Sequence, residues 1–103
     1  MNWYLAKFHT VSGKPEEYVY GKSKKVIKEF LYNYYSESSS YVILKEDINN
    51  TELISLKNKS RTDIKDMIGR GLNPYRAVDI HNGIVWESCA DGEIKQEMIY
   101  LKN

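Results

Sequence analysis

Residues 77–89 read AVDIHNGIVWESC, and this stretch predicts the best-defined part of the fold. Runs of strand-forming residues stand on both sides of Asn82-Gly83. An Asn-Gly pair in this setting is the strongest short-range signal for a β-hairpin, because both residues of a type I′ turn need φ > 0. We therefore predict strands over 77–81 and 84–89, joined by a two-residue turn.

A third strand is predicted to follow this hairpin. Ala90-Asp91-Gly92 has turn chemistry, and residues 94–101 alternate in two sets with a period of two. The prediction is a C-terminal β-meander in which Ile84, Trp86 and Met98 face the core. We expect the last strand to lie at a sheet edge, where Lys95 and Lys102 would oppose pairing with another chain. Such an edge keeps a homodimer as an alternative.

The N-terminal third predicts a hairpin followed by a helix. Residues 2–11 are dense in strand formers with apolar groups on both faces, which favours a central strand. Ser12-Gly13-Lys14-Pro15 predicts a turn, and 16–20 the returning strand. Ser23 is a candidate N-cap for a helix over about 24–35. Its apolar stripe has helical period: Val26, Ile27, Phe30, Leu31 and Tyr34.

The middle of the chain predicts two more strands and a second helix. Residues 41–44 form a compact apolar run, and 53–56 predict a strand, although a helical turn there stays open. Ser60 and Asp63 have capping-box spacing before a helix over about 61–69. The predicted order is ββα-ββ-α-βββ. It indicates one α+β domain over residues 1–103, an antiparallel sheet of about five to seven strands with two helices.

Composition restricts the function classes. The net charge is +1, so no global field draws the chain to nucleic acid or a membrane. The single cysteine, Cys89, excludes an internal disulfide and the usual multi-thiolate zinc site. No signal peptide and no apolar run of membrane-spanning length occur, so we expect a cytoplasmic protein.

Catalytic chemistry has few candidates. His9 and His81 have neither the spacing of a helical zinc motif nor an adjacent partner. Cys89 has acidic neighbours that oppose thiolate formation, and we interpret it as a half-buried strand residue. We expect no enzyme, metal or cofactor. The enzyme hypothesis kept open is a nuclease or toxin that uses His81 with Arg70 or Arg76.

Charge is distributed unevenly along the chain. Residues 57–76 carry six basic side chains against two acidic ones, and residues 14–28 carry five lysines against two glutamates. Residues 77–101 carry five acidic side chains against Lys95 alone. This pattern predicts a bipolar surface, with two basic helical segments and an acidic meander. The alternative is that these charges only keep the outer faces of helices and strands solvated.

The favoured hypothesis is a small non-enzymatic binding or inhibitory protein that acts through a protein–protein interface. Richness in Lys, Ile, Asn and Tyr suggests an AT-rich genome, and so an accessory protein of a bacterial mobile element or phage. The alternative is a nucleic-acid-binding module that uses basic segments 22–28 and 57–76. Identity of the partner stays open. The candidate contact residues are Lys24, Lys25, Lys28, Tyr32, Tyr35, Arg61, Lys65, Arg70 and Arg76.

Overall fold

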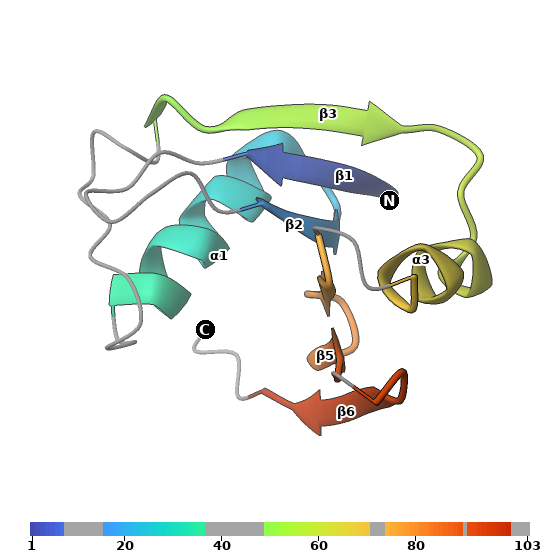
Figure 1. Cartoon of the computed structure of the whole chain (residues 1–103). Coiled ribbons are helices and arrows are strands. Elements are labelled where there is room, and N and C mark those ends of the chain that lie inside the picture. Colours follow the sequence, from blue (N-terminus) through green and yellow to red (C-terminus); the bar gives the residue numbers. More distant parts are fainter. Residues whose placement is uncertain (8–15, 37–48, 71–73, 90, 100–103) are drawn as a thin grey trace.

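A computed structural model describes residues 1–7, 16–36, 49–70, 74–89 and 91–99 (Figure 1). The predicted strand at 41–44, the turn at 12–15 and His9 lie outside these residues. The described part contains helices α1 and α3 and one six-stranded sheet with the order β3-β1-β2-β4-β5-β6. The fold class predicted from the sequence, α+β with a C-terminal meander, is confirmed.

The N-terminal hairpin and first helix form as expected. β1 (Asn2–Lys7) pairs antiparallel with β2 (Glu16–Gly21) on one side and with β3 on the other, so β1 is an interior strand. α1 (Lys24–Ser36) begins after Ser23, whose Oγ accepts the Val26 backbone N–H at 3.2 Å. Gly21 allows α1 to approach the sheet closely: a Cβ there would lie 2.6 Å from Ile27 Cγ1.

The second helix begins at the predicted capping box. β3 (Glu52–Leu56) is a strand and not a helical turn, and α3 (Arg61–Ile68) follows it. Ser60 Oγ accepts the Asp63 N–H at 3.1 Å, while the Asp63 carboxylate accepts the Ser60 N–H at 2.8 Å. These two bonds satisfy backbone donors that the helix itself leaves unpaired. Gly69 caps the other end.

The C-terminal meander is present, but its first turn differs from the prediction. β4 (Arg76–Asp79) pairs with β5 (Ile84–Ser88), and β5 pairs with β6 (Ile94–Met98), all antiparallel. Asp79 lies opposite Ile84, so the loop has four residues, 80–83, and only Gly83 has a positive φ, of 65°. The type I′ prediction is wrong because the Asp79 carboxylate accepts the Asn82 backbone N–H at 3.1 Å and shapes a longer turn.

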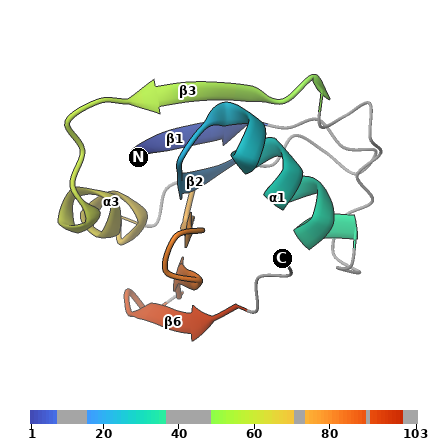
Figure 2. The ribbon, with the colours of Figure 1, turned by 180° about the vertical axis from the view of Figure 1, so that it is seen from behind.

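The two helices cover opposite faces of the sheet, as the two views from front and back show (Figures 1 and 2). One core cluster joins α1 to Tyr4, Ala6, Val19 and Leu53. The other joins α3 to alternate positions of the same strands and to β4 and β5: Trp3, Tyr18, Ala77 and Trp86. We name these faces the α1 side and the α3 side. Each helix covers only part of its own face.

Two further details depart from expectation. β2 and β4 run parallel, so the sheet is mixed, whereas the sequence predicted an antiparallel sheet. Met98, predicted as core, is 69% exposed on β6, the last strand in the sheet order. Trp86 is buried as expected, and Ile84 is half-buried.

Candidate protein-binding surface

Arg61, a predicted contact residue, has a structural partner inside the protein. Its Nη2 donates to Asp79 Oδ2 at 2.6 Å, and the Asp79 side chain is fully buried. The Asn82 side-chain amide donates to the same Asp79 oxygen at 2.9 Å. A buried carboxylate is costly unless it is paired in this way. Arg61 therefore holds the end of β4, although half of its side chain is exposed.

Two basic side chains of α3, Arg61 and Lys65, lie over the indole ring of Trp86. The Lys65 Nζ lies 4.6 Å and the Arg61 guanidinium 5.6 Å from the ring centre of Trp86. These are cation–π distances, and they fix the basic side chains of α3 against β5. The Trp86 Nε1–H donates to Gln96 Oε1 at 2.9 Å, which also ties β6 to this cluster.

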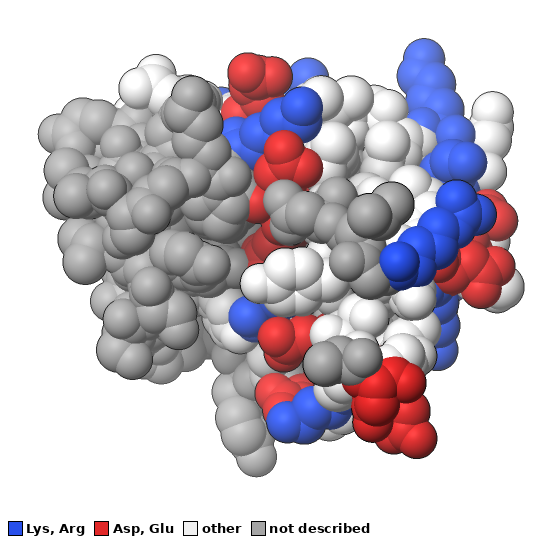
Figure 3. All heavy atoms as spheres, in the orientation of Figure 1, with Lys and Arg blue, Asp and Glu red and all other residues white. Residues whose placement is uncertain are grey.

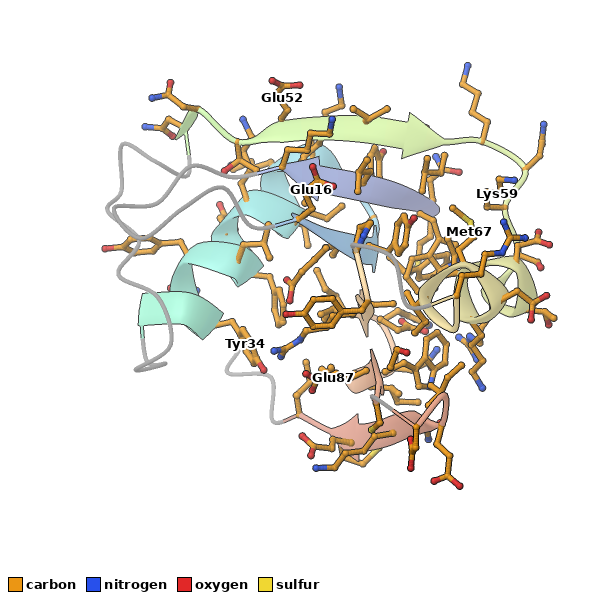
Figure 4. All side chains as sticks on the ribbon, viewed as in Figure 1. Glu16, Tyr34, Glu52, Lys59, Met67 and Glu87 are labelled. Carbon is orange, nitrogen blue, oxygen red and sulfur yellow. The ribbon has the colours of Figure 1, made fainter. Side chains whose placement is uncertain are left out.

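Arg76, another predicted contact, belongs to a charged row on the α1 side. The pairing of strands β2, β4, β5 and β6 aligns Glu17, Arg76, Glu87 and Lys95, so the charge alternates from strand to strand. Arg76 Nε lies 3.0 Å from Glu17 Oε1, and the guanidinium also hydrogen-bonds the Tyr34 hydroxyl. Figure 4 shows Tyr34 and Glu87 coming from α1 and β5 to this region. Arg76 is therefore held by contacts within the protein.

The remaining predicted residues are divided between the two sides. Lys24 and Lys25 are exposed on α1, while Lys28 is half-buried with its Nζ 3.4 Å from the Asn49 carbonyl oxygen. Tyr32 packs against the α1-side core, and the side chain of Tyr35 lies outside the described residues. Arg70 is exposed beyond α3. The basic residues of α1 are therefore not brought together with those of α3.

An apolar surface that sequence reasoning missed lies at the β3 end of the sheet. Ile54 is directly opposite Leu5 on the α3 side and is 42% exposed. Leu5, Leu56 and Met67 are half-buried and pack against the α3-side core. Figure 4 shows Met67 reaching from α3 toward β1 and β3. We name these four residues the β3 surface. One sequence signal for this surface was available. The run 53–56 has apolar residues on both faces, whereas only two helices were predicted to cover the sheet.

Charged side chains border the β3 surface on one side. Strand pairing places Lys7 between Glu52 and Glu16, one row from Leu5 and Ile54 on the same face. Figure 3 shows such a column of red and blue atoms beside uncharged surface on this side of the molecule. Next to it, burial and the Glu16 charge raise the pKa of the Tyr18 hydroxyl, and Arg70 partly offsets this. The apolar surface therefore has a polar rim, as protein interfaces do.

His81 and Arg76, two of the residues considered for catalysis, are not brought together. His81 is exposed in the loop after β4, whereas Arg76 begins β4, so the two lie at opposite ends of that strand. Cys89 is exposed, which corrects the half-buried prediction, because it lies just past β5. Within the described residues, no three His, Cys, Asp or Glu side chains gather as metal ligands would.

Comparisons with known proteins add no information on function, so the β3 surface is the main guide. No model of a known protein family, no curated protein and no solved structure matches the chain. Among the described residues, neither helix has the length and apolar character needed to cross a membrane.

Proposed function

We propose that this chain is a small non-enzymatic protein that binds another protein through the β3 surface. One observation carries the proposal: exposed apolar side chains and an open sheet edge coincide on β3. β3 ends the sheet order, and within the described residues only β1 pairs with it. Ile54 and Leu5 present apolar area on the same strand pair.

The chemistry of this edge favours an extended segment as the partner element. A strand added to β3 would gain main-chain hydrogen bonds from the edge, while alternate side chains of that strand would contact Ile54 and Leu56, which lie on the same face of β3. Glu52, which ends the row of Glu52, Lys7 and Glu16 at this edge, favours a partner with a basic side chain beside it. Exposed apolar surface of this kind supports a protein partner more than a nucleic acid.

The composition supports a setting for this binding. We place the protein in the cytoplasm of a low-GC bacterium, as an accessory protein of a phage or mobile element that inhibits a host protein. The support is compositional: the chain is rich in Lys, Ile, Asn and Tyr and holds one cysteine. The fold itself assigns no activity.

Nucleic-acid binding is the second candidate, and one observation favours it. Lys24 and Lys25 are exposed in the first turn of α1, which has no acidic residue. Positive charge there opposes the helix dipole, so helix stability does not explain these lysines. If the chain binds nucleic acid in this way, changing Lys24, Lys25 and Lys28 to Glu should abolish nucleic-acid binding with little change in thermal stability.

Site-specific cross-linking separates the two candidates. A photo-cross-linking amino acid replaces Ile54 in one variant and exposed Lys25 in a matched control, and both are expressed in the native host. We expect position 54 to capture one protein, identified by mass spectrometry, both with and without nuclease treatment. Capture through position 25 alone, lost with nuclease, would overturn the proposal in favour of nucleic acid.

Affinity then tests the surface with the captured protein. We expect Ile54→Asp to weaken binding by at least roughly thirtyfold, because it places a charge in an apolar contact. Ser55→Asp is the matched control, since Ser55 is exposed on the same strand but on the α1 side. Equal loss in both variants would contradict a specific role for the β3 surface.

A further inference from the structure

The other end of the sheet carries a strand that is exposed throughout. β6 is the last strand in the sheet order, and within the described residues only β5 pairs with it. All five of its residues are exposed. Ile94 and Met98 are 38% and 69% exposed, and both lie on the α3 side. Open edges with exposed apolar side chains invite a further strand.

The hydrogen bonds flanking β6 show which backbone groups face outward. The Cys89 N–H donates to Glu93 O at 2.7 Å, and the Ile99 N–H donates to Gly83 O at 2.8 Å. In an antiparallel pair, bonded residues alternate with residues whose N–H and C=O point away. Lys95 and Glu97 therefore bond to β5. The outward groups are those of Ile94, Gln96 and Met98.

We propose that β6 pairs antiparallel with β6 of a second copy of this chain, with Gln96 on the two-fold axis. In this register Ile94 lies opposite Met98 of the second copy, and Lys95 lies opposite its Glu97. The outward backbone groups of both strands then meet one another. The strand is thus self-complementary in backbone, charge and apolar residues, as a two-fold interface requires.

The alternative registers are electrostatically worse. A slide of two residues, which keeps the outward backbone groups matched, places Lys95 opposite Lys95 or Glu97 opposite Glu97. Like charges directly opposite each other destabilise a strand pair. Within one chain, Lys95 Nζ lies 2.7 Å from Glu97 Oε1. The hydrogen bond between them raises the pKa of Lys95 and lowers that of Glu97, so both stay charged near neutral pH.

The pairing would leave the rest of the molecule unchanged. It covers Ile94 and Met98 on the α3 side and joins two six-stranded sheets into one continuous sheet. The β3 surface lies at the far end of this sheet, so self-association and partner binding do not compete. Failure of one proposal therefore leaves the other standing.

Charge exchange provides the test, with mass measured by sedimentation. The chain has a mass of 12.1 kDa, and we expect twice that mass for the wild type at high concentration. Lys95→Glu and Glu97→Lys should each weaken the dimer by roughly tenfold or more, because each substitution acts twice across the axis. An equal mixture of the two single variants, and the double variant, should both recover dimers. A monomeric wild type at millimolar concentration, or no recovery in the mixture, would overturn the proposal.

Hydrogen exchange on the wild type provides a second measurement that needs no variant. We expect the amides of Ile94, Gln96 and Met98 to become protected as concentration rises. The amides of Lys95 and Glu97 should be protected at all concentrations, because they bond to β5. Protection of the Ile94, Gln96 and Met98 amides that is absent or independent of concentration would contradict the pairing.

Discussion

Two arginines of this chain stabilise buried carboxylates at distant positions. Arg61 pairs with Asp79 on the α3 side, and Arg76 pairs with Glu17 on the α1 side. Asp79 and Glu17 are 0% and 3% exposed, so each would be costly to bury alone. Both arginines therefore contribute to stability.

The Arg61 pair gives a prediction for stability. Arg61→Met leaves the Asp79 carboxylate with only the Asn82 donors, and we expect a loss of about 2 kcal/mol, reduced by the partial exposure of Arg61. Lys65→Met is the control, because Lys65 also lies over Trp86, and it should cost less than about 1 kcal/mol. Urea unfolding measures both. Equal losses would show that the indole contact, and not Asp79, explains the effect.

These pairings also show what sequence reasoning finds at the residue scale. Ser60 and Asp63 were predicted to cap α3 because a capping box is local, with partners three residues apart. Arg61 and Asp79 are 18 residues apart, and nothing near either residue indicates the other. Five of the nine predicted contact residues are consequently packed or paired within the protein: Lys28, Tyr32, Arg61, Lys65 and Arg76.

Among the elements, α3 depends most on its first turn. The hydrogen bonds from Ser60, with a smaller contribution from Lys59, hold the pKa of Asp63 below its ordinary value. A depressed carboxyl pKa contributes stability that is present above the unfolded-state pKa. That stability is lost as pH falls through the folded-state pKa.

Ser60→Ala tests this cap. We expect a loss of about 1 kcal/mol at pH 7, since the Ser60 hydroxyl no longer accepts the Asp63 N–H. The pKa of Asp63 should rise but stay below its ordinary value, because the residue 60 backbone N–H still donates to it. Carboxyl NMR titration and urea unfolding at pH 7 provide the measurements. An unchanged Asp63 pKa would exclude the hydroxyl as a cause of the depression.

Elements with a clear period were predicted closely, and turns less so. The helices predicted over 24–35 and 61–69 are found at Lys24–Ser36 and Arg61–Ile68, because a stripe and a cap define each one. The Asn82-Gly83 turn was misjudged because pair statistics do not include the buried Asp79 carboxylate that binds Asn82. The hairpin strands, predicted over 77–81 and 84–89, are found at Arg76–Asp79 and Ile84–Ser88, so the first strand ends two residues earlier than predicted.

At the scale of the whole molecule, one sheet separates two cores. Ile27 of α1 is buried against one face of the sheet, and Ile64 of α3 is buried against the other face. We expect Ile27→Val and Ile64→Val each to cost about 1 kcal/mol. Because they belong to separate core clusters on opposite faces, their effects should add within about 0.5 kcal/mol in one unfolding transition. Two transitions, or a large coupling energy, would contradict a single cooperative unit.

The sequence could not reveal this division into two faces. Strands with apolar residues on both faces indicate two covered faces, but periodicity does not say which helix covers which face. Strand order was equally hidden, because the parallel pairing of β2 with β4 joins segments that are distant in the chain. The β3 surface and the mixed sheet both follow from that order. The sequence therefore indicated which positions are apolar, but it did not indicate which of them another element covers.

The central pairing of β2 with β4 has a consequence for synthesis of the chain. β1, β2 and α1 leave the ribosome before β4, the strand that completes the far side of β2. Until then the nascent chain exposes the unpaired backbone edge of β2 and the side chain of Tyr18, which belongs to the core cluster under α3 in the folded protein. Such an intermediate is prone to aggregation, and long-range parallel pairing forms slowly. A ribosome that pauses before residue 76 would therefore leave this protein at its most vulnerable to misfolding.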